Sequence, residues 1–238
     1  MNGNHSLLKL KLNWQYLAAF LLLEFICMQA HVIIHHLTGS LVCGEWGAMT
    51  FTVFTLSGNC FETNPLALLA TAAGPALSYF LMWTGMFFLL RGEQSLFGFS
   101  LIFANLPFAR FVTVLMKGGD EMVIARRFLG DESWAIILCL TVLMLLPPLA
   151  TAFKSIGNRR RWLIFSVFLL LPLLFDGVLK RVLLEPLINR WEMTATPVFG
   201  IPLFIVIVDV IALTAFACCV KYLFGKICRA QRLTLNTA

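Results

Sequence analysis

Long apolar stretches separated by short polar segments dominate the chain. The stretches at 66–90 and 133–153 contain no Asp, Glu, Lys or Arg. A helix of about 20 apolar residues crosses a hydrocarbon core of about 30 Å. The pattern therefore predicts an all-α membrane protein with six spanning helices, at roughly 14–37, 66–90, 95–116, 133–153, 162–184 and 197–222.

The segment that follows the first stretch, 39–65, has a different pattern. Polar and β-favouring apolar residues alternate over 50–56, and a Ser-Gly-Asn turn signal follows at 57–59. This pattern predicts a short β-hairpin-like loop. An open sheet edge cannot face lipid, so we expect the loop at the membrane interface or inside the protein. Cys43 and Cys60 flank the loop, and an oxidising compartment allows a disulfide between them.

Composition agrees with a membrane protein, because 60% of the 238 residues are hydrophobic and 13% are charged. We find no internal repeat or linker, so 1–238 is predicted to be a single polytopic domain in a lipid bilayer. Lys and Arg are commoner on the side of the two termini, eleven against six, which predicts cytoplasmic termini. The net charge of +6 reflects this bias rather than a nucleic-acid surface. The chain has so little soluble mass that it has no place to hold a duplex, which argues against nucleic acid as a partner. The expected location is the plasma membrane or a bacterial inner membrane.

Two histidines near the end of the first stretch carry the strongest chemical signal. His31 and His35 are four residues apart and share one helix face, the spacing that gives a zinc ion its first two ligands. In the predicted topology Asp120 and Asp176 reach a similar depth from other helices. Two histidines and a carboxylate are a common zinc ligand set, and bound zinc activates water near neutral pH.

Other ionisable residues also fall within the apolar stretches, where each is a functional candidate. Glu24 lies on the His31 face about 10 Å deeper, and we expect it to pair with Arg110 or to anchor two helices. Asp209 is expected to be a protonated or hydrogen-bonded buried acid. Glu24, Arg110, Asp176 and Asp209 together allow an alternative function, a small transporter or channel, although no inverted repeat is visible.

The order of short motifs along the chain resembles a known family. The motifs are His-x-x-x-His-x-x-Thr-Gly at 31–39, Ala-Gly-Pro at 73–75, Asn-x-Pro at 105–107 and Gly-Asp at 119–120. With the β-like loop after the first, they resemble the site-2 protease family of intramembrane zinc metallopeptidases. The resemblance covers 14–128 and leaves 129–238 as three additional helices. It implies a zinc-dependent protein that hydrolyses peptide bonds of membrane-embedded substrates.

The resemblance also implies a set of metal ligands. His31 and His35 take the places of the family's two histidine ligands. Asp120 is the best match to the aspartate that completes the set, although it follows the Asn-x-Pro element at a longer distance than in the family. Asp176, in a local Asp-Gly element of a later span, is the second choice.

The chain departs from the family at the residue after His31. There the family has a glutamate, the general base, and this chain has Val32, which cannot take or give a proton. A positioned base contributes roughly 10²–10⁴-fold to a rate. Glu121, beside the expected ligand Asp120, is the candidate substitute. Without a substitute, the resemblance implies a catalytically inactive pseudo-protease that binds a transmembrane partner.

Overall fold

The computed structural model of the protein describes residues 7–92, 94–130, 133–190 and 199–224. Within these ranges it contains helices and no β-strand, as the apolar pattern predicts. Six helical segments are long and apolar enough to cross a membrane, which indicates a multi-pass integral membrane protein. They are Trp14–Cys43, Ala67–Arg91, Ser95–Leu115, Trp134–Ser155, Arg161–Ile188 and Leu203–Tyr222.

The observed segments differ from the expected ones mainly at their ends. The first helix continues through Gly39 to Cys43 rather than ending at residue 37. Gly44 has a φ of 75° and donates its backbone N–H to the carbonyl of Ser40, which closes the helix. Residues 197–198 of the expected last span lie outside the described residues.

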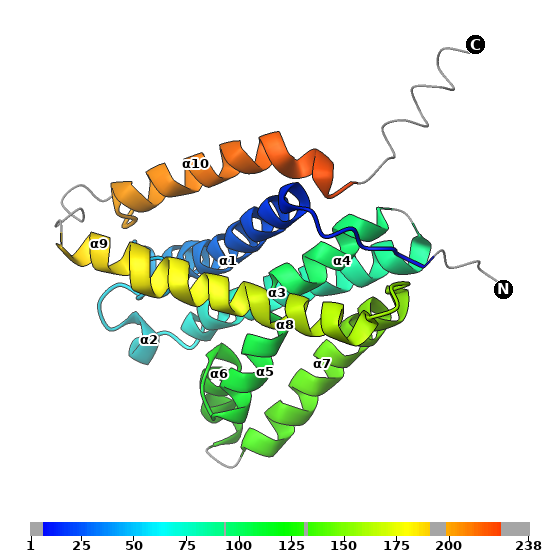
Figure 1. The fold of residues 1–238 in the computed structure, drawn as a ribbon. Coiled ribbons are helices and arrows are strands. Elements are labelled where there is room, and N and C mark those ends of the chain that lie inside the picture. Colours follow the sequence, from blue (N-terminus) through cyan, green and yellow to red (C-terminus); the bar gives the residue numbers. More distant parts are fainter. Residues whose placement is uncertain (1–6, 93, 131–132, 191–198, 225–238) are drawn as a thin grey trace, which may run out of the picture.

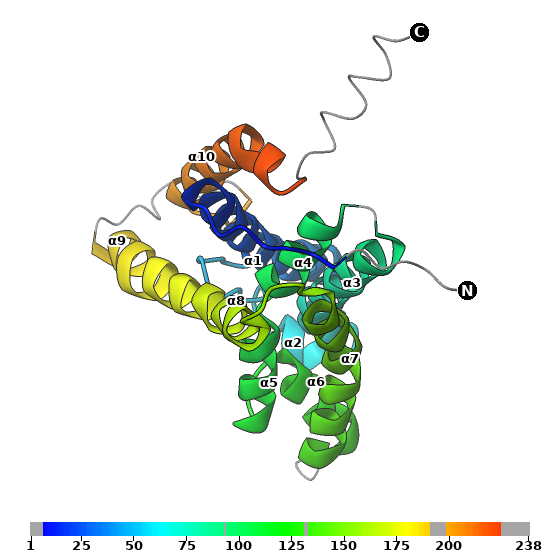
Figure 2. The same ribbon diagram turned by 45° about the vertical axis from the view of Figure 1, so that its right-hand side comes forward.

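Helix α1 (Trp14–Cys43) lies at the centre of the fold. The side chain of Asn13 caps its start by accepting a hydrogen bond from the backbone N–H of Tyr16. Figures 1 and 2 show α1 between α10 on one side and the α3–α4 pair on the other. These neighbours are α3 (Ala67–Arg91), α4 (Ser95–Ala104) and α10 (Leu203–Cys219).

The third span is broken in the middle. Helix α4 ends at Ala104, Leu106 takes a left-handed φ of 50°, and α5 (Pro107–Leu115) begins with a proline that cannot donate a backbone hydrogen bond. Helix α6 (Asp120–Leu129) starts after two glycines. The sequence predicts this second break, because two glycines before two acids do not continue a helix.

The remaining elements complete the bundle around α1. A cluster of phenylalanines, which includes Phe20 and Phe168, fills the core where α1, α4 and α8 meet. The last membrane segment before α10 changes from α8 to the π-helical η2 and then to α9 without a break. These elements are α2 (Cys60–Thr63), α7 (Trp134–Ser155), α8 (Arg161–Asp176), η2 (Gly177–Leu184), α9 (Glu185–Arg190) and η3 (Val220–Tyr222).

The loop after α1 is partly buried in the protein, while Trp46 and Val53 are exposed. Met49 and Phe54 form one antiparallel bridge rather than strands, and both Met49 and Phe51 are buried. Cys43 and Cys60 form a disulfide that closes the loop. The hairpin-like reversal is therefore present with a single bridge and two backbone hydrogen bonds, from Thr50 to Val53 and from Thr55 to Ala48.

Candidate metal centre

His31, His35 and Asp120 converge at one point inside the helix bundle. The Nε2 atoms of the two histidines lie 3.1 Å apart. Oδ2 of Asp120 lies 3.5 Å from Nε2 of His31 and 3.3 Å from Nε2 of His35. Both histidines are buried, and Asp120 is partly exposed. Among the described residues, this group could hold a metal ion, as the sequence predicts.

The distances among the three ligand atoms fit a tetrahedral zinc ion. Zinc binds histidine nitrogen and carboxylate oxygen at about 2.0–2.1 Å, so two ligand atoms of a tetrahedron are separated by about 3.3–3.4 Å. The three observed separations, 3.1, 3.3 and 3.5 Å, bracket this value. Three protein ligands leave a fourth position open, which is the arrangement of catalytic rather than structural zinc sites.

His35 presents a lone pair to the centre. Its Nδ1 lies 2.6 Å from the carbonyl oxygen of Ala70, which can only accept, so Nδ1 carries the hydrogen and Nε2 does not. Phe54 of the loop stacks on the ring at 4.4 Å between centroids and fixes its plane. Nε2 of His35 and the Asp120 carboxylate are then both acceptors facing each other. A cation between them removes the repulsion.

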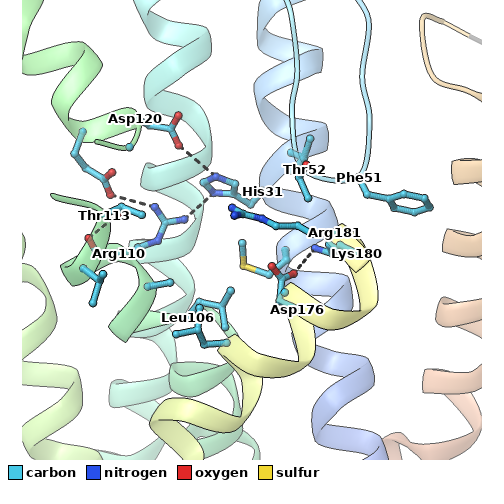
Figure 3. Close-up of a pocket in the computed structure, with 18 residues that line it drawn as sticks. His31, Phe51, Thr52, Leu106, Arg110, Thr113, Asp120, Asp176, Lys180 and Arg181 are labelled. Carbon is cyan, nitrogen blue, oxygen red and sulfur yellow. Dashed lines mark hydrogen bonds and ion pairs between the residues drawn. The ribbon is translucent and has the colours of Figure 1, made fainter. Parts of the chain in front are cut away.

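His31 is held by Ser78 and Arg110. Its Nδ1 lies 3.2 Å from the Ser78 hydroxyl and 2.8 Å from Nη2 of Arg110, which can only donate. A metal on Nε2 requires the hydrogen on Nδ1, where Ser78 can accept it and Arg110 cannot. The Arg110 guanidinium must therefore move off Nδ1 when a metal binds. Figure 3 shows Arg110 and Asp120 on different sides of the His31 ring.

The Asp120 carboxylate is ready to act as a ligand at neutral pH. Burial alone would raise its pKa, but the contacts with His31 and His35 outweigh burial and hold the pKa well below its usual value. Asp120 is also the first residue of α6, where the exposed backbone N–H groups favour a negative charge. The helix break at the preceding glycines brings this carboxylate back toward α1.

Gly74 provides the space in which the two imidazoles meet. A Cβ atom at Gly74 would overlap Nε2 of His35 and lie 2.6 Å from Cε1 of His31. In the sequence, the Ala-Gly-Pro segment also fits a seam of small residues between helices. The structure shows that this seam faces the metal centre.

Replacing Gly74 with alanine is expected to weaken zinc binding about 5- to 150-fold, because overpacking costs about 1–3 kcal/mol. Gly177→Ala is the matched control, since a Cβ atom there meets nothing within 4 Å. Competition with a chromophoric chelator measures both affinities. Equal zinc affinity in the Gly74 variant and the wild type would show that the centre does not need this space.

Glu121, the expected general base, is held in an ion pair beside the centre. Its Oε1 accepts hydrogen bonds from Nη1 of Arg110 at 3.1 Å and from the hydroxyl of Tyr79 at 3.0 Å. Its side chain is mostly buried. Its Oε2 accepts no hydrogen bond from the described residues, so this oxygen is the one that could take a proton. The catalytic role of Glu121 stays a prediction.

A cavity of about 490 Å³ opens beside the centre. It is bounded by α1, the loop, the α5–α6 connection and the π-helical η2. Val32 lines it, so the position at which the family carries its base faces the cavity with an apolar side chain. The polar part of its lining includes His31, Thr52, Arg110, Asp120, Glu121, Asp176, Lys180 and Arg181.

Asp176, the second choice for the aspartate ligand, has a different partner. Its Oδ1 lies 2.8 Å from Nζ of the buried Lys180. It lines the same cavity but is not part of the group that converges with the histidines. The broken third span explains why the structure brings Asp120 to the histidines, since the glycine turn folds α6 back along the bundle.

The expected pairing of Glu24 with Arg110 is wrong. Arg110 is occupied by Glu121, His31 and Ser78. Glu24 is fully buried and interacts electrostatically with Lys180 and Asp176 instead. Lys180 lies in η2, and neither carboxylate oxygen of Glu24 has a hydrogen-bond partner within the described residues. The other expectation for Glu24, a polar anchor between helices, stays a prediction.

Asp209 has the hydrogen bond expected of it. Its Oδ1 accepts from Nε2 of Gln29 at 3.0 Å, which joins α10 to α1.

Sequence reasoning missed three residues that shape the site. The sequence pattern groups Ser78 with the small residues of the seam. The available signal was its position four residues after Gly74, which puts both residues on the same helix face. Phe54 falls in the alternating loop and gives no sign that it stacks on a histidine. Arg181 is counted only as a topological charge, although it lines the cavity.

Comparison with known proteins adds no assignment. No protein-family model, curated protein or solved structure matches the chain.

Proposed function

We propose that this chain is an intramembrane zinc metallopeptidase-like protein that hydrolyses peptide bonds of membrane-embedded substrates. The observation that carries the proposal is the separation of 3.1–3.5 Å among the ligand atoms of His31, His35 and Asp120. The adjoining cavity gives a substrate access to the open position. A zinc ion held there supplies a Lewis acid that activates water at neutral pH.

The orientation of the chain supports an outward-facing site. We propose cytoplasmic termini, from the excess of Lys and Arg on that side. Helix α1 then runs outward, and the Cys43–Cys60 disulfide after it lies on the oxidising side. The substrate is a transmembrane protein or peptide that reaches the cavity from the bilayer, in a plasma membrane or bacterial inner membrane.

Each residue around the proposed metal centre has its own role in cleaving the peptide bond. Ser78 and the Ala70 carbonyl orient the two histidines, and Asp120 supplies the negative ligand. Glu121 is the proposed proton acceptor, through its Oε2. Release of Arg110 from His31 leaves the guanidinium paired with Glu121, so Arg110 holds that carboxylate near the centre.

Replacing Glu121 with glutamine is expected to lower peptide hydrolysis roughly 10²–10⁴-fold while zinc stays bound. The measurement is mass-spectrometric detection of cleavage of a transmembrane peptide in micelles, with zinc content determined on the same sample. Glu62→Gln serves as the control, because Glu62 is exposed on α2 away from the cavity. Unchanged cleavage by the Glu121 variant would contradict its role as base.

A second function is favoured by one observation, the apolar Val32 on the cavity wall. With no base at this position and Glu121 in an ion pair, the chain would keep the metal and bind a transmembrane partner without cutting it. Cleavage of transmembrane peptides by the wild type separates the two functions, since only the peptidase turns over.

A further inference from the structure

Most charged groups that line the cavity contact a partner within the described residues. Arg110 pairs with Glu121, and Lys180 pairs with Asp176. The remaining acid, Asp120, is taken by the two histidines. Arg181 also lines the cavity and has no acidic partner within the described part of the chain. An unpaired arginine in a candidate membrane span is costly, which makes it a functional candidate.

The acid best placed to neutralise Arg181 is used elsewhere. Glu185 lies four residues later on the same helical segment, where a carboxylate would normally pair with an arginine. Its Oε1 instead accepts hydrogen bonds from the hydroxyls of Thr50 at 2.8 Å and Thr52 at 2.7 Å. The position four residues before Arg181 is Gly177, which has no charge. The loop therefore holds Glu185 and leaves Arg181 available.

The π-helical turn brings two consecutive cations to the same cavity. Lys180 and Arg181 both lie in η2, whose wider turn reduces the angle between successive side chains compared with an α-helix. Lys180 is buried against Asp176, while Arg181 is exposed to the cavity. Figure 3 shows the Arg181 side chain extending from η2 toward His31. Arg181 and the ligand residues His31 and Asp120 thus line the same cavity.

We propose that Arg181 binds a carboxylate of the peptide substrate beside the metal centre. The planar guanidinium matches a carboxylate with two parallel hydrogen bonds, and such charge-assisted bonds are stronger than neutral ones. The proposal rests on the proposed function, because it assigns that site a substrate class: peptides that present a side-chain or terminal carboxylate to the cavity. Neutral peptides lack the group that Arg181 recognises.

The test compares two ligands that differ only in this charge. An N-acetyl dipeptide with a free carboxylate and the same dipeptide as its amide are titrated calorimetrically into the zinc-loaded full-length protein in an uncharged maltoside detergent. The wild type should prefer the carboxylate. Arg181→Gln should reduce that preference about 10- to 100-fold, the effect of losing a hydrogen bond between charged groups. Arg181→Lys, which keeps the charge, should recover part of it.

Arg159→Gln is the matched control, because Arg159 is exposed in the connection between α7 and α8 and its loss removes the same charge. It should keep the wild-type preference. Equal preference in the wild type and Arg181→Gln would overturn the proposal, as would Arg181-dependent binding of a short-chain phosphatidic acid without binding of the dipeptide. A wild type that prefers the carboxylate but takes up no zinc would refute the metallopeptidase and leave the Arg181 site standing.

Discussion

Protein in which both His31 and His35 are replaced by alanine is expected to purify without zinc, whereas the wild type carries about one zinc ion per chain. The double variant leaves Asp120 as the only member of the ligand group, and one carboxylate does not hold zinc against the water of the cavity. Elemental analysis after gel filtration gives the zinc content of both proteins.

His36→Ala is the control for this experiment. His36 is the same residue type on the next position of α1, but its Nε2 contacts the carbonyl oxygen of Phe199 at 2.8 Å and its ring packs on Trp46. It should retain the zinc of the wild type. A double variant with the wild-type zinc content would place the metal elsewhere and contradict the assignment of the histidines.

Replacing Val32 with glutamate is the second change with a large expected effect. It places a carboxylate on the cavity wall, one residue after His31, where the resembled family carries its general base. If the scaffold is that of a metallopeptidase, hydrolysis of a transmembrane peptide should rise roughly 10²–10⁴-fold above a base-free enzyme. The increase in hydrolysis rate over the wild type measures how much general-base catalysis Glu121 already supplies.

Val32→Gln separates the base from the polar side chain. Glutamine has the size of glutamate and cannot take a proton at neutral pH, so it should not raise the rate. Cleavage is followed by mass spectrometry on the same transmembrane peptide. Equal rates in the glutamate and glutamine variants would mean that position 32 does not face the reacting atoms.

Much of the fold follows from the sequence because the membrane restricts the choice of elements. Uncharged stretches such as 66–90 must satisfy their backbone groups internally and therefore form helices. The break before Asp120 is also predictable from two glycines. The exact ends of the helices are not predictable in this way. Helix α1 runs through Gly39 and ends at Cys43, before the left-handed Gly44.

The metal centre is predictable in part, because helix geometry and membrane topology both restrict where its residues lie. His31 and His35 share a helix face by geometry alone, and topology brings Asp120 to their depth. Ser78 and Arg181 could not be found, because their roles depend on how α3 and the π-helical turn pack against α1. Helical periodicity along one segment contains no information about partners in another.

The partner of Glu24 likewise could not be predicted from the periodicity of one segment. Topology places Glu24 and Arg110 both within the membrane, and opposite charges there are expected to pair. Which charges meet depends on which segment packs on α1 at each depth. Arg110 contacts His31, while Glu24, two turns deeper on the same face, interacts with Lys180.

X-ray absorption at the zinc edge of the purified wild-type protein tests the central claim most directly. We expect four light ligands at about 2.0–2.1 Å, two of them with the outer-shell scattering of imidazole, from His31, His35, Asp120 and a water molecule. A sulfur shell at about 2.3 Å, or protein that binds no zinc when it is supplied during purification, would contradict the proposed metal centre.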